Sequence, residues 1–189
     1  MGRDEPPLWE GIEGLDDAPP PRAEAAVPVP GRSFVVRTDG AARGNPGPAS
    51  LGAVLIDASR ADARDPAATG DASISEYLGV QTNNVAEYTG VVRALALAER
   101  LGADEVDLLL DSKLIVEQLA GRWRVKDAKL APLHAEARRY LAGFRRWTAR
   151  HVPRAQNGAA DALANEAIDR VRAGGPAALE RVGGTVTGR

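Results

Sequence analysis

The chain has 189 residues, of which 44% are hydrophobic and 26% are charged, which suits one globular domain with tails and excludes a wholly disordered chain. It contains no cysteine, so disulfides, Cys-ligated zinc and thiol nucleophiles are excluded, and its two histidines are too few for a His-rich metal site. A bound metal would therefore be a hard cation held by carboxylates.

Charge is distributed unevenly along the chain, although the formal net charge is only -2. Residues 1–30 carry two arginines and seven acids, whereas residues 113–154 carry eleven lysines and arginines and three acids. Such a basic stretch suits a polyanion such as nucleic acid. The same charges could equally be the solvated face of ordinary helices.

Composition also divides the chain into a domain and two tails. Seven of the thirteen prolines fall within residues 1–32, which predicts a disordered, acidic, Pro-rich arm. Residues 173–189 are predicted to be a flexible tail, which leaves 33–172 as the folded domain. The N-terminus has no basic region followed by an apolar run, and no apolar stretch approaches the roughly 20 residues that span a bilayer. We therefore expect a cytoplasmic protein without a membrane partner.

The first half of the domain begins with strand signals. Apolar-rich segments at Phe34–Thr38, Leu51–Asp57 and Ser73–Val80 are separated by residues typical of turns and loops, which predicts three strands in a meander. The apolar spacing that follows has the period of a helix. This helix is expected to begin at Asn84, as part of a capping box, and to stop at Gly102.

The second half alternates strands and helices. Strands are predicted at Val106–Leu110 and Trp147–Val152, and helices at 112–120, 128–142 and Ala159–Val171. Because the last two strands are reached through helices, they are expected to be parallel. The predicted fold class is therefore α/β, with a five-stranded mixed sheet (a three-strand antiparallel meander plus parallel strands) flanked by helices.

Four acids stand at the ends of these elements. Asp39 and Asp111 each follow a predicted strand, and Glu87 and Asp161 lie in the first turns of predicted helices. Ligands collect at the carboxyl ends of strands in such sheets, and four carboxylates gathered there would need cations such as two Mg²⁺ to offset their repulsion. Each acid also has a structural explanation, namely a turn for Asp39, helix capping for Glu87 and Asp111, and a favourable helix dipole for Asp161.

Longer motifs surround the four acids. They are TDGAARGNPG at 38–47, TNNVAEY at 82–88, Asp111-Ser112 after an apolar strand, and HVPRAQNGAADALA at 151–164. Together, and in this order across residues 33–172, they resemble type 1 ribonuclease H. The resemblance implies the ribonuclease H-like fold and an endonuclease that hydrolyses the RNA strand of RNA–DNA hybrids, leaving 5′-phosphate and 3′-hydroxyl ends.

The resemblance also assigns roles to the site residues. It implies two Mg²⁺ ions, for which Mn²⁺ can substitute, with Asp39 bridging both ions. Asp161 would help to hold the ion that activates the attacking water, and Glu87 and Asp111 would hold the ion on the leaving-group side. His151 matches the family's mobile histidine, which is thought to aid proton transfer or product release, and an imidazole titrates in the right range. The alternative for His151 is an ordinary surface histidine in a loop.

Further residues of the motifs are expected to contact substrate. They offer amides, hydroxyls or cationic groups that can hold phosphates and the 2′-hydroxyls that only RNA carries. Helix capping is the alternative for those at the start of the first predicted helix, and Asn84 can do both. The set is Asn45, Thr82, Asn83, Asn84, Lys113, Arg154 and Asn157.

Two departures from the family pattern concern substrate binding. Many bacterial members carry a long basic protrusion after the third motif, whereas residues 121–126 lead here almost directly into the next helix. Lys113 stands where many members have Gln. Arg122, Arg124, Lys126 and Lys129 are expected to compensate in part through counterion release.

We expect a monomer whose partners are RNA–DNA hybrids, with other RNA-containing duplexes as further candidates, because some relatives without the protrusion accept them. Two alternatives remain open from the sequence. One is a non-enzymatic nucleic-acid-binding module, against which the presence of all four acids argues. The other is a DNA-processing nuclease of the same fold, against which the TDG and TNN motifs argue.

Overall fold

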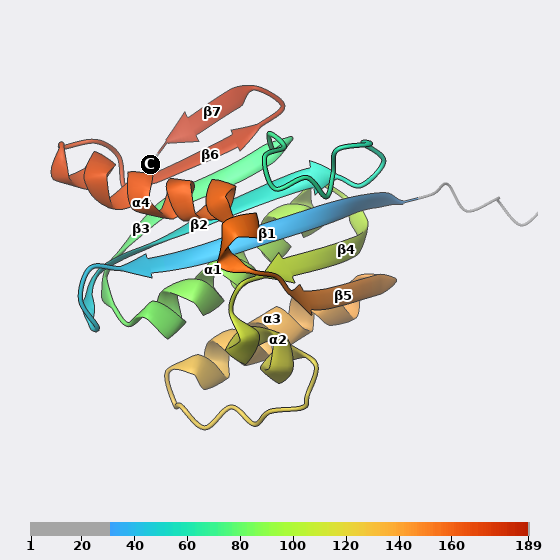
Figure 1. Cartoon of the computed structure of the whole chain (residues 1–189), viewed down its shortest axis with the longest axis horizontal. Helices are drawn as coiled ribbons and strands as arrows, with labels where there is room; N and C mark the ends of the chain where they lie inside the picture. Colours follow the sequence, from blue (N-terminus) through green and yellow to red (C-terminus); the bar gives the residue numbers. More distant parts are fainter. Residues whose placement is uncertain (1–30, 189) are drawn as a thin grey trace, which may run out of the picture.

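One mixed β-sheet with helices on both faces accounts for residues 31–188, the part of the chain that the computed structural model describes (Figure 1). The strands are β1 (Arg32–Ala42), β2 (Gly47–Asp57), β3 (Ala72–Gln81), β4 (Ala103–Leu110), β5 (Arg146–His151), β6 (Ala178–Val182) and β7 (Thr185–Gly188). The helices are α1 (Asn83–Arg100), α2 (Lys113–Leu119), α3 (Leu130–Gly143) and α4 (Gly158–Arg172), with a short 3₁₀ helix η1 (Arg154–Gln156) before α4.

The sheet contains the predicted meander and the predicted parallel strands. Within the described residues its order is β5-β4-β1-β2-β3-β6-β7. Strands β1, β2 and β3 are antiparallel neighbours, and β4 runs parallel to both β1 and β5. Strands β1 and β2 are longer than predicted, because part of the turn-rich segment 39–48 continues their ladder as far as the pair Ala42↔Ala49.

The prediction of five strands is wrong, because the sheet of residues 31–188 has seven. The segment 173–189, expected to be a flexible tail, contributes β6 antiparallel to β3 and β7 antiparallel to β6. These strands carry weak apolar signals, since β6 is only half-buried and β7 is exposed. Backbone pairing with β3, from Ala72↔Val182 to Glu76↔Ala178, organises the hairpin instead. The predicted arm at 1–32 lies outside the described residues, apart from its last two positions, and β1 already begins at Arg32.

Arg170 links the hairpin to the rest of the domain. Its Nη1 donates to Ser75 Oγ at 2.9 Å and its Nη2 to the Ser75 carbonyl at 2.7 Å, while Nε donates to the Pro176 carbonyl at 2.8 Å. Arg100 of α1 also pairs with Glu180 of β6 at 2.5 Å. The hairpin is therefore held by side chains from helices on both faces of the sheet.

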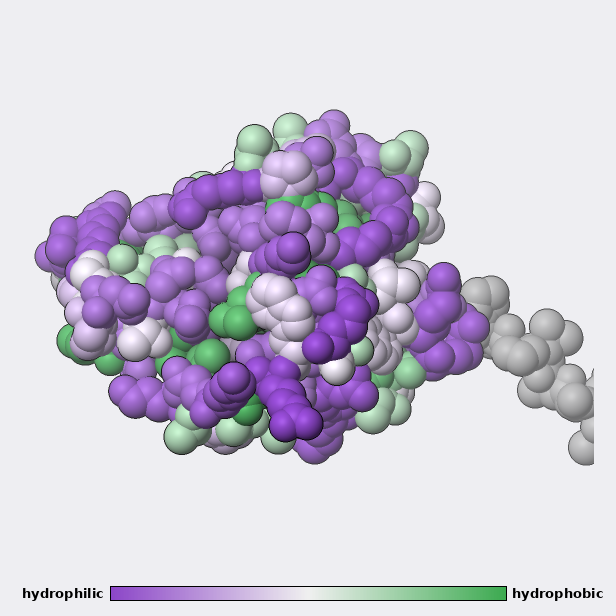
Figure 2. All heavy atoms as spheres, turned by 60° about the horizontal axis from the view of Figure 1, so that its bottom comes forward, coloured by the Kyte–Doolittle hydropathy of each residue, from purple (hydrophilic) through white to green (hydrophobic). Residues whose placement is uncertain are grey.

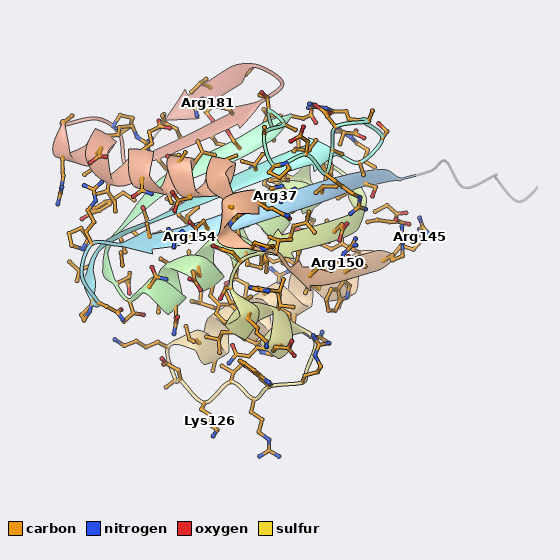
Figure 3. The ribbon with its side chains drawn as sticks, viewed as in Figure 1. Arg37, Lys126, Arg145, Arg150, Arg154 and Arg181 are labelled. Carbon is orange, nitrogen blue, oxygen red and sulfur yellow. The ribbon has the colours of Figure 1, made fainter. Side chains whose placement is uncertain are left out.

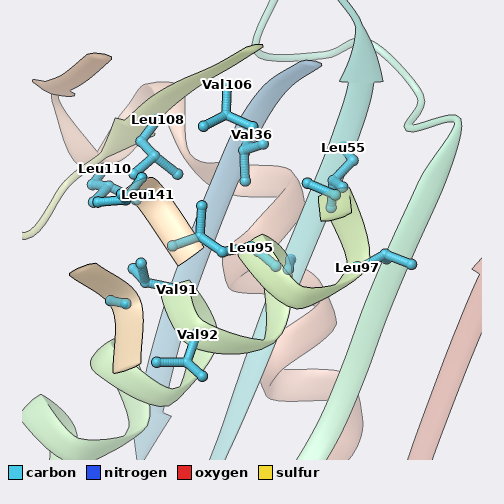
Figure 4. Close-up of a cluster of buried hydrophobic side chains, with 14 of the residues drawn as sticks. Val36, Leu55, Val91, Val92, Leu95, Leu97, Val106, Leu108, Leu110 and Leu141 are labelled. Atoms are coloured by element: carbon cyan, nitrogen blue, oxygen red, sulfur yellow. The ribbon is translucent and has the colours of Figure 1, made fainter. Parts of the chain in front are cut away.

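Two apolar layers cover the sheet. The larger is formed where α1 and α3 pack on one face, and Figure 4 shows Val91, Leu95 and Leu141 of these helices meeting Val36 and Leu108 of the strands. The smaller layer lies on the opposite face, beneath α4, which crosses in front of β1 and β2 in Figure 1. The site residues on β1 therefore lie between two packed layers.

Two glycines let the helices approach the strands that carry the acids. A Cβ on Gly40 would lie 2.2 Å from the backbone nitrogen of Glu87, so α1 begins directly against β1. A Cβ on Gly52, the ladder partner of Asp39, would lie 2.1 Å from the Ala160 carbonyl of α4. Because any larger residue would push the helix starts away, these glycines bring Glu87 and Asp161 towards Asp39.

The surface around α2, α3 and the loop between them is mainly hydrophilic, as Figure 2 shows with this side turned forward. The loop, residues 120–129, contains no helix, and its Trp123 is 47% exposed. No helix within 31–188 is long and apolar enough to cross a membrane.

Candidate active site

Asp39 is the buried centre of the acidic cluster. It lies within β1 and is only 4% exposed. Its Oδ1 accepts the Gly40 N–H at 2.9 Å, whereas its buried Oδ2 has no hydrogen-bond partner. Burial, followed by the negative charges of Asp111 and Asp161, raises the pKa of Asp39 to about 8. A carboxylate with this environment is a strong acceptor for a cation.

Glu87 reaches the cluster from the first turns of α1. The cap of this helix is Thr82, whose Oγ1 accepts the Val85 N–H at 3.4 Å, so the predicted capping role of Asn84 is wrong. Asn83 Nδ2 donates to Glu87 Oε1 at 2.7 Å. Burial is the main cause that raises the pKa of Glu87, and the charge of Asp111 adds to it, while hydrogen bonds act in the opposite direction.

Asp111 follows β4 and is oriented by Asn157. The Asn157 amide donates to Asp111 Oδ1 at 3.0 Å and to the Thr38 carbonyl at 2.8 Å. Asn157 is fully buried, so it cannot make the substrate contact predicted for it without leaving this position. Its place is behind the acids, where it joins the ends of β1 and β4 to the start of α4.

Asp161 lies in the first turn of α4 and already has two polar partners. Arg154 Nη2 donates to its Oδ1 at 2.5 Å, and Asn165 Nδ2 donates to its Oδ2 at 3.1 Å. The Arg154 side chain is 75% exposed, so it can move without disturbing the core. Figure 3 shows Arg154 near the start of α4.

His151 lies at the end of β5 beside the third motif. Its Nε2 lies 3.1 Å from the Asp111 carbonyl oxygen, and the ring is exposed. The structure therefore brings this histidine to the edge of the acidic cluster. When Nε2 donates to that carbonyl, Nδ1 is left as a proton acceptor.

The remaining predicted substrate residues lie around this edge. Asn45 Oδ1 accepts the Asn83 N–H at 3.2 Å, which joins the β1–β2 turn to the start of α1. Asn84 is exposed on the first turn of α1, and Lys113 is exposed on the first turn of α2. Thr82 has its hydroxyl engaged as the helix cap. Asn45, Asn84 and Lys113 are therefore accessible from solvent, whereas Thr82 and Asn83 are partly buried.

Two residues of this region were not identified by the sequence analysis. Asn165 lies one turn after Asp161, and this i, i+4 spacing could have indicated the contact. Arg37 lies two residues before Asp39 and is 2% exposed. The only signal for it was a charged residue inside an otherwise apolar strand.

The donor set fits a hard divalent cation. It consists of carboxylate oxygens, one of them buried and unpartnered, and a positive ion would offset the repulsion that raises the pKa of Asp39. Among residues 31–188, no three His, Asp or Glu side chains stand in an arrangement that is already a metal site. In this structure Asp161 is instead turned to Arg154 and Asn165.

The fold and this cluster together define a domain of the ribonuclease H-like class. A family model described as reverse transcriptase-like matches residues 37–167. Ribonuclease HI of Halobacterium salinarum is 44% identical over 135 residues, which cover 69% of this chain and 62% of that protein. Ribonuclease H of Polaromonas sp. is 34% identical over 155 residues, which cover 72% of this chain and 88% of that protein. The chain belongs to the type 1 ribonuclease H family.

Solved structures agree with this assignment. The N-terminal RNase H domain of Rv2228c from Mycobacterium tuberculosis, solved as a fusion with maltose binding protein, is 43% identical, with a TM-score of 0.68 over 76% of this chain and 98% of that chain. LC11-RNase H1 in complex with an RNA/DNA hybrid is 36% identical, with a TM-score of 0.65 over 74% of this chain and 99% of that chain.

Several relatives are much longer than the region that matches. The bifunctional protein Rv2228c of Mycobacterium tuberculosis is 46% identical over 135 residues, which cover 71% of this chain but only 35% of that protein. The shared part of the two proteins is thus the ribonuclease H domain.

Proposed function

We propose that this domain is an endonuclease that hydrolyses the RNA strand of RNA–DNA hybrids with divalent metal ions, Mg²⁺ in the first place, and leaves 5′-phosphate and 3′-hydroxyl ends. The observation that carries the proposal is the buried Asp39, whose pKa of about 8 and unpartnered Oδ2 arise among the other acids of the four motifs. Its Oδ1 accepts the Gly40 N–H, whereas Oδ2 makes no structural contact and is suited to a metal ion.

In this proposal Asp39, Glu87, Asp111 and Asp161 hold two ions. The ions would supply an activated water and stabilise charge on the attacking and leaving oxygens of an in-line displacement. Asn157 has a supporting part, because it keeps the Asp111 carboxylate aimed at the site through a buried hydrogen bond of 3.0 Å.

Arg154 is proposed to exchange partners when substrate and metal bind. In this structure it neutralises Asp161 through a hydrogen bond of 2.5 Å. A metal ion at Asp161 would replace that positive charge, and the exposed guanidinium would then be free to bind a substrate phosphate. His151 would accept or deliver a proton at the same edge, because its ring stands next to Asp111.

Hybrid binding is proposed to use the exposed groups around this edge. Asn84 and Lys113 are accessible from the helix starts, and Lys126 extends from the loop between α2 and α3 (Figure 3). That loop takes the place of the basic protrusion of other family members. With fewer phosphate contacts than a long basic protrusion can make, binding should be weaker and depend less steeply on salt than in members with the protrusion. The cations that face solvent in the loop are Arg122, Arg124, Lys126 and Lys129.

Cleavage of a labelled RNA–DNA hybrid tests the proposal, with duplex RNA and duplex DNA assayed beside it in Mg²⁺ and in Mn²⁺. Asp111→Asn should reduce cleavage at least about a thousandfold while the variant still binds hybrid. Asp62→Asn is the matched control, since Asp62 is an exposed acid paired with Arg60 in the β2–β3 loop.

Each alternative has its own result. Equal cleavage of duplex DNA would indicate a DNA-processing nuclease of the same fold. Hybrid binding without cleavage in either metal would indicate a non-enzymatic binding module.

A further inference from the structure

The most unusual buried group outside the acidic cluster is the guanidinium of Arg37. This residue lies on β1, two positions before Asp39 and on the same face of the strand, where α4 covers the sheet (Figure 3). Its side chain belongs to a layer that is otherwise apolar and includes Val35, Val54 and Leu109. A buried charge in such a layer is costly unless polar groups surround it.

Hydrogen bonds from the Arg37 side chain to two separate segments of backbone offset this cost. Its Nη1 donates to the Gln156 carbonyl and its Nη2 to the Arg64 carbonyl, both at 2.8 Å. No ion pair of Arg37 occurs among the described residues, although Asp107 and Asp65 lie close enough to raise its pKa against the stronger lowering effect of burial. The guanidinium therefore acts mainly by hydrogen-bonding two loops to each other.

The first of these loops leads directly into the site. Gln156 ends η1 and precedes Asn157, whose amide holds the Thr38 carbonyl and Asp111 Oδ1. The Asn157 carbonyl in turn accepts the Asp161 N–H at 3.1 Å, at the start of α4. A bond at Gln156 thus fixes the backbone one residue before the side chain that orients Asp111.

The second loop covers the same face. Arg64 belongs to the β2–β3 connection, and its own side chain pairs with Asp107 of β4. The two carbonyls that Arg37 binds thus belong to loops that are far apart in the chain, and within residues 31–188 no other side chain hydrogen-bonds to both. An apolar side chain could fill the position at less electrostatic cost, so packing alone does not account for an arginine here.

We infer that Arg37 is a positioning residue for the proposed reaction, which holds the segment His151–Asn157 and the start of α4 in register with β1. Through this segment it sets the relative places of Asp39, Asp111 and Asp161 without touching substrate or metal. The inference rests on the proposed nuclease function for its catalytic part, but its structural part can be measured separately.

The test compares Arg37→Met, which keeps length and apolar contact, with Arg37→Lys, which keeps the charge but lacks the planar fork. Arg93→Met is the matched control, since Arg93 lies on α1 and pairs with Glu76 at 3.1 Å on the protein surface. Because displacement of a reacting group by about 1 Å can cost about a hundredfold, we expect kcat to fall roughly ten- to a hundredfold in both Arg37 variants. KM for hybrid should change less than about twofold, and the Mg²⁺ concentration for half-maximal rate should rise.

Hydrogen exchange supplies a readout that does not depend on activity. In Arg37→Met the amides of Gln156 and Asn157, which bond to Pro153 and Arg154 carbonyls at 2.8 Å, should exchange faster, while those of α1 keep their protection. Unchanged exchange at these amides would overturn the inference, whether or not the protein cleaves hybrid. A folded Arg37→Met variant with wild-type kcat and Mg²⁺ dependence would overturn it as well, whereas a wild-type protein without cleavage would refute only the proposed function.

Discussion

Replacement of Asp39 by Asn should stabilise the metal-free protein. The pKa of Asp39 is about 8 in the folded protein against an ordinary value of 3.8, mainly because of burial. Between these values the folded state holds a proton that the unfolded state releases, so stability falls as pH rises through this interval. Asn has nearly the same shape and cannot ionise, so the Asp39→Asn variant lacks this loss.

The size of the effect follows from the shift. A change of about four pKa units, at about 1.4 kcal/mol each, corresponds to an upper limit of about 6 kcal/mol. Because water and neighbouring side chains rearrange around an ionised carboxylate, we expect roughly 2 to 4 kcal/mol of this to be measured. The advantage of the variant should be near zero at about pH 4, grow with pH and level off above about pH 8.

Urea unfolding in EDTA at several pH values between 4 and 9 measures this difference. Asp62→Asn is the control, because a hydrogen bond from Arg60 lowers the pKa of Asp62 and its loss should not stabilise the protein at any of these pH values. Added Mg²⁺ should raise the Tm of the wild type more than that of Asp39→Asn, since the variant lacks a ligand. An Asp39→Asn advantage that does not change with pH, or a variant less stable throughout, would refute the reasoning.

Two other substitutions test how the site is held. Gly40→Ala should lower the free energy of unfolding by at least about 3 kcal/mol and remove most of the cleavage activity, because its Cβ would lie 2.2 Å from the Glu87 nitrogen. Gly143→Ala is the control, since its Cβ would meet no atom within 4 Å. Similar Tm values for the two variants would contradict this. Tyr88→Phe should lower the free energy of unfolding in denaturant by about 1–3 kcal/mol, because it removes the hydroxyl that donates to Gln118 Oε1 at 2.7 Å. Tyr77 is half-buried, and the same loss in Tyr77→Phe would show that the buried hydrogen bond is not the cause.

Much of the fold could be predicted from the sequence, because its signals are local. The apolar period of α1, the buried run of β4 and the turn residues between the first strands depend only on neighbours along the chain, and each of these elements is present. The four acids were found in the same way, since each lies at or near the end of a predicted element, although Asp39 lies inside the longer β1 of the structure. Their assembly at one edge was expected only if the first and fourth strands are parallel neighbours, as β1 and β4 are.

Other features depend on contacts between distant segments, which no local pattern specifies. The β6–β7 hairpin exists because its backbone pairs with β3, about a hundred residues earlier in the chain, and not because its side chains are strongly apolar. Asn157 reads as a polar loop residue, yet packing of α4 against β1 buries it completely behind Asp111.

The electrostatic state of the site is likewise a tertiary property. The sequence alone determined that Asp39, Asp111 and Asp161 stand at or near the ends of strands and helices. That they meet at one sheet edge depended on β1 and β4 being parallel neighbours. Only the tertiary structure decided how deeply Asp39 is buried, that Arg154 neutralises Asp161, and that Arg37 joins two loops beneath the site. The physical reason is that burial and charge interactions depend on distances in space, which are set when α4 and the loops pack onto the sheet.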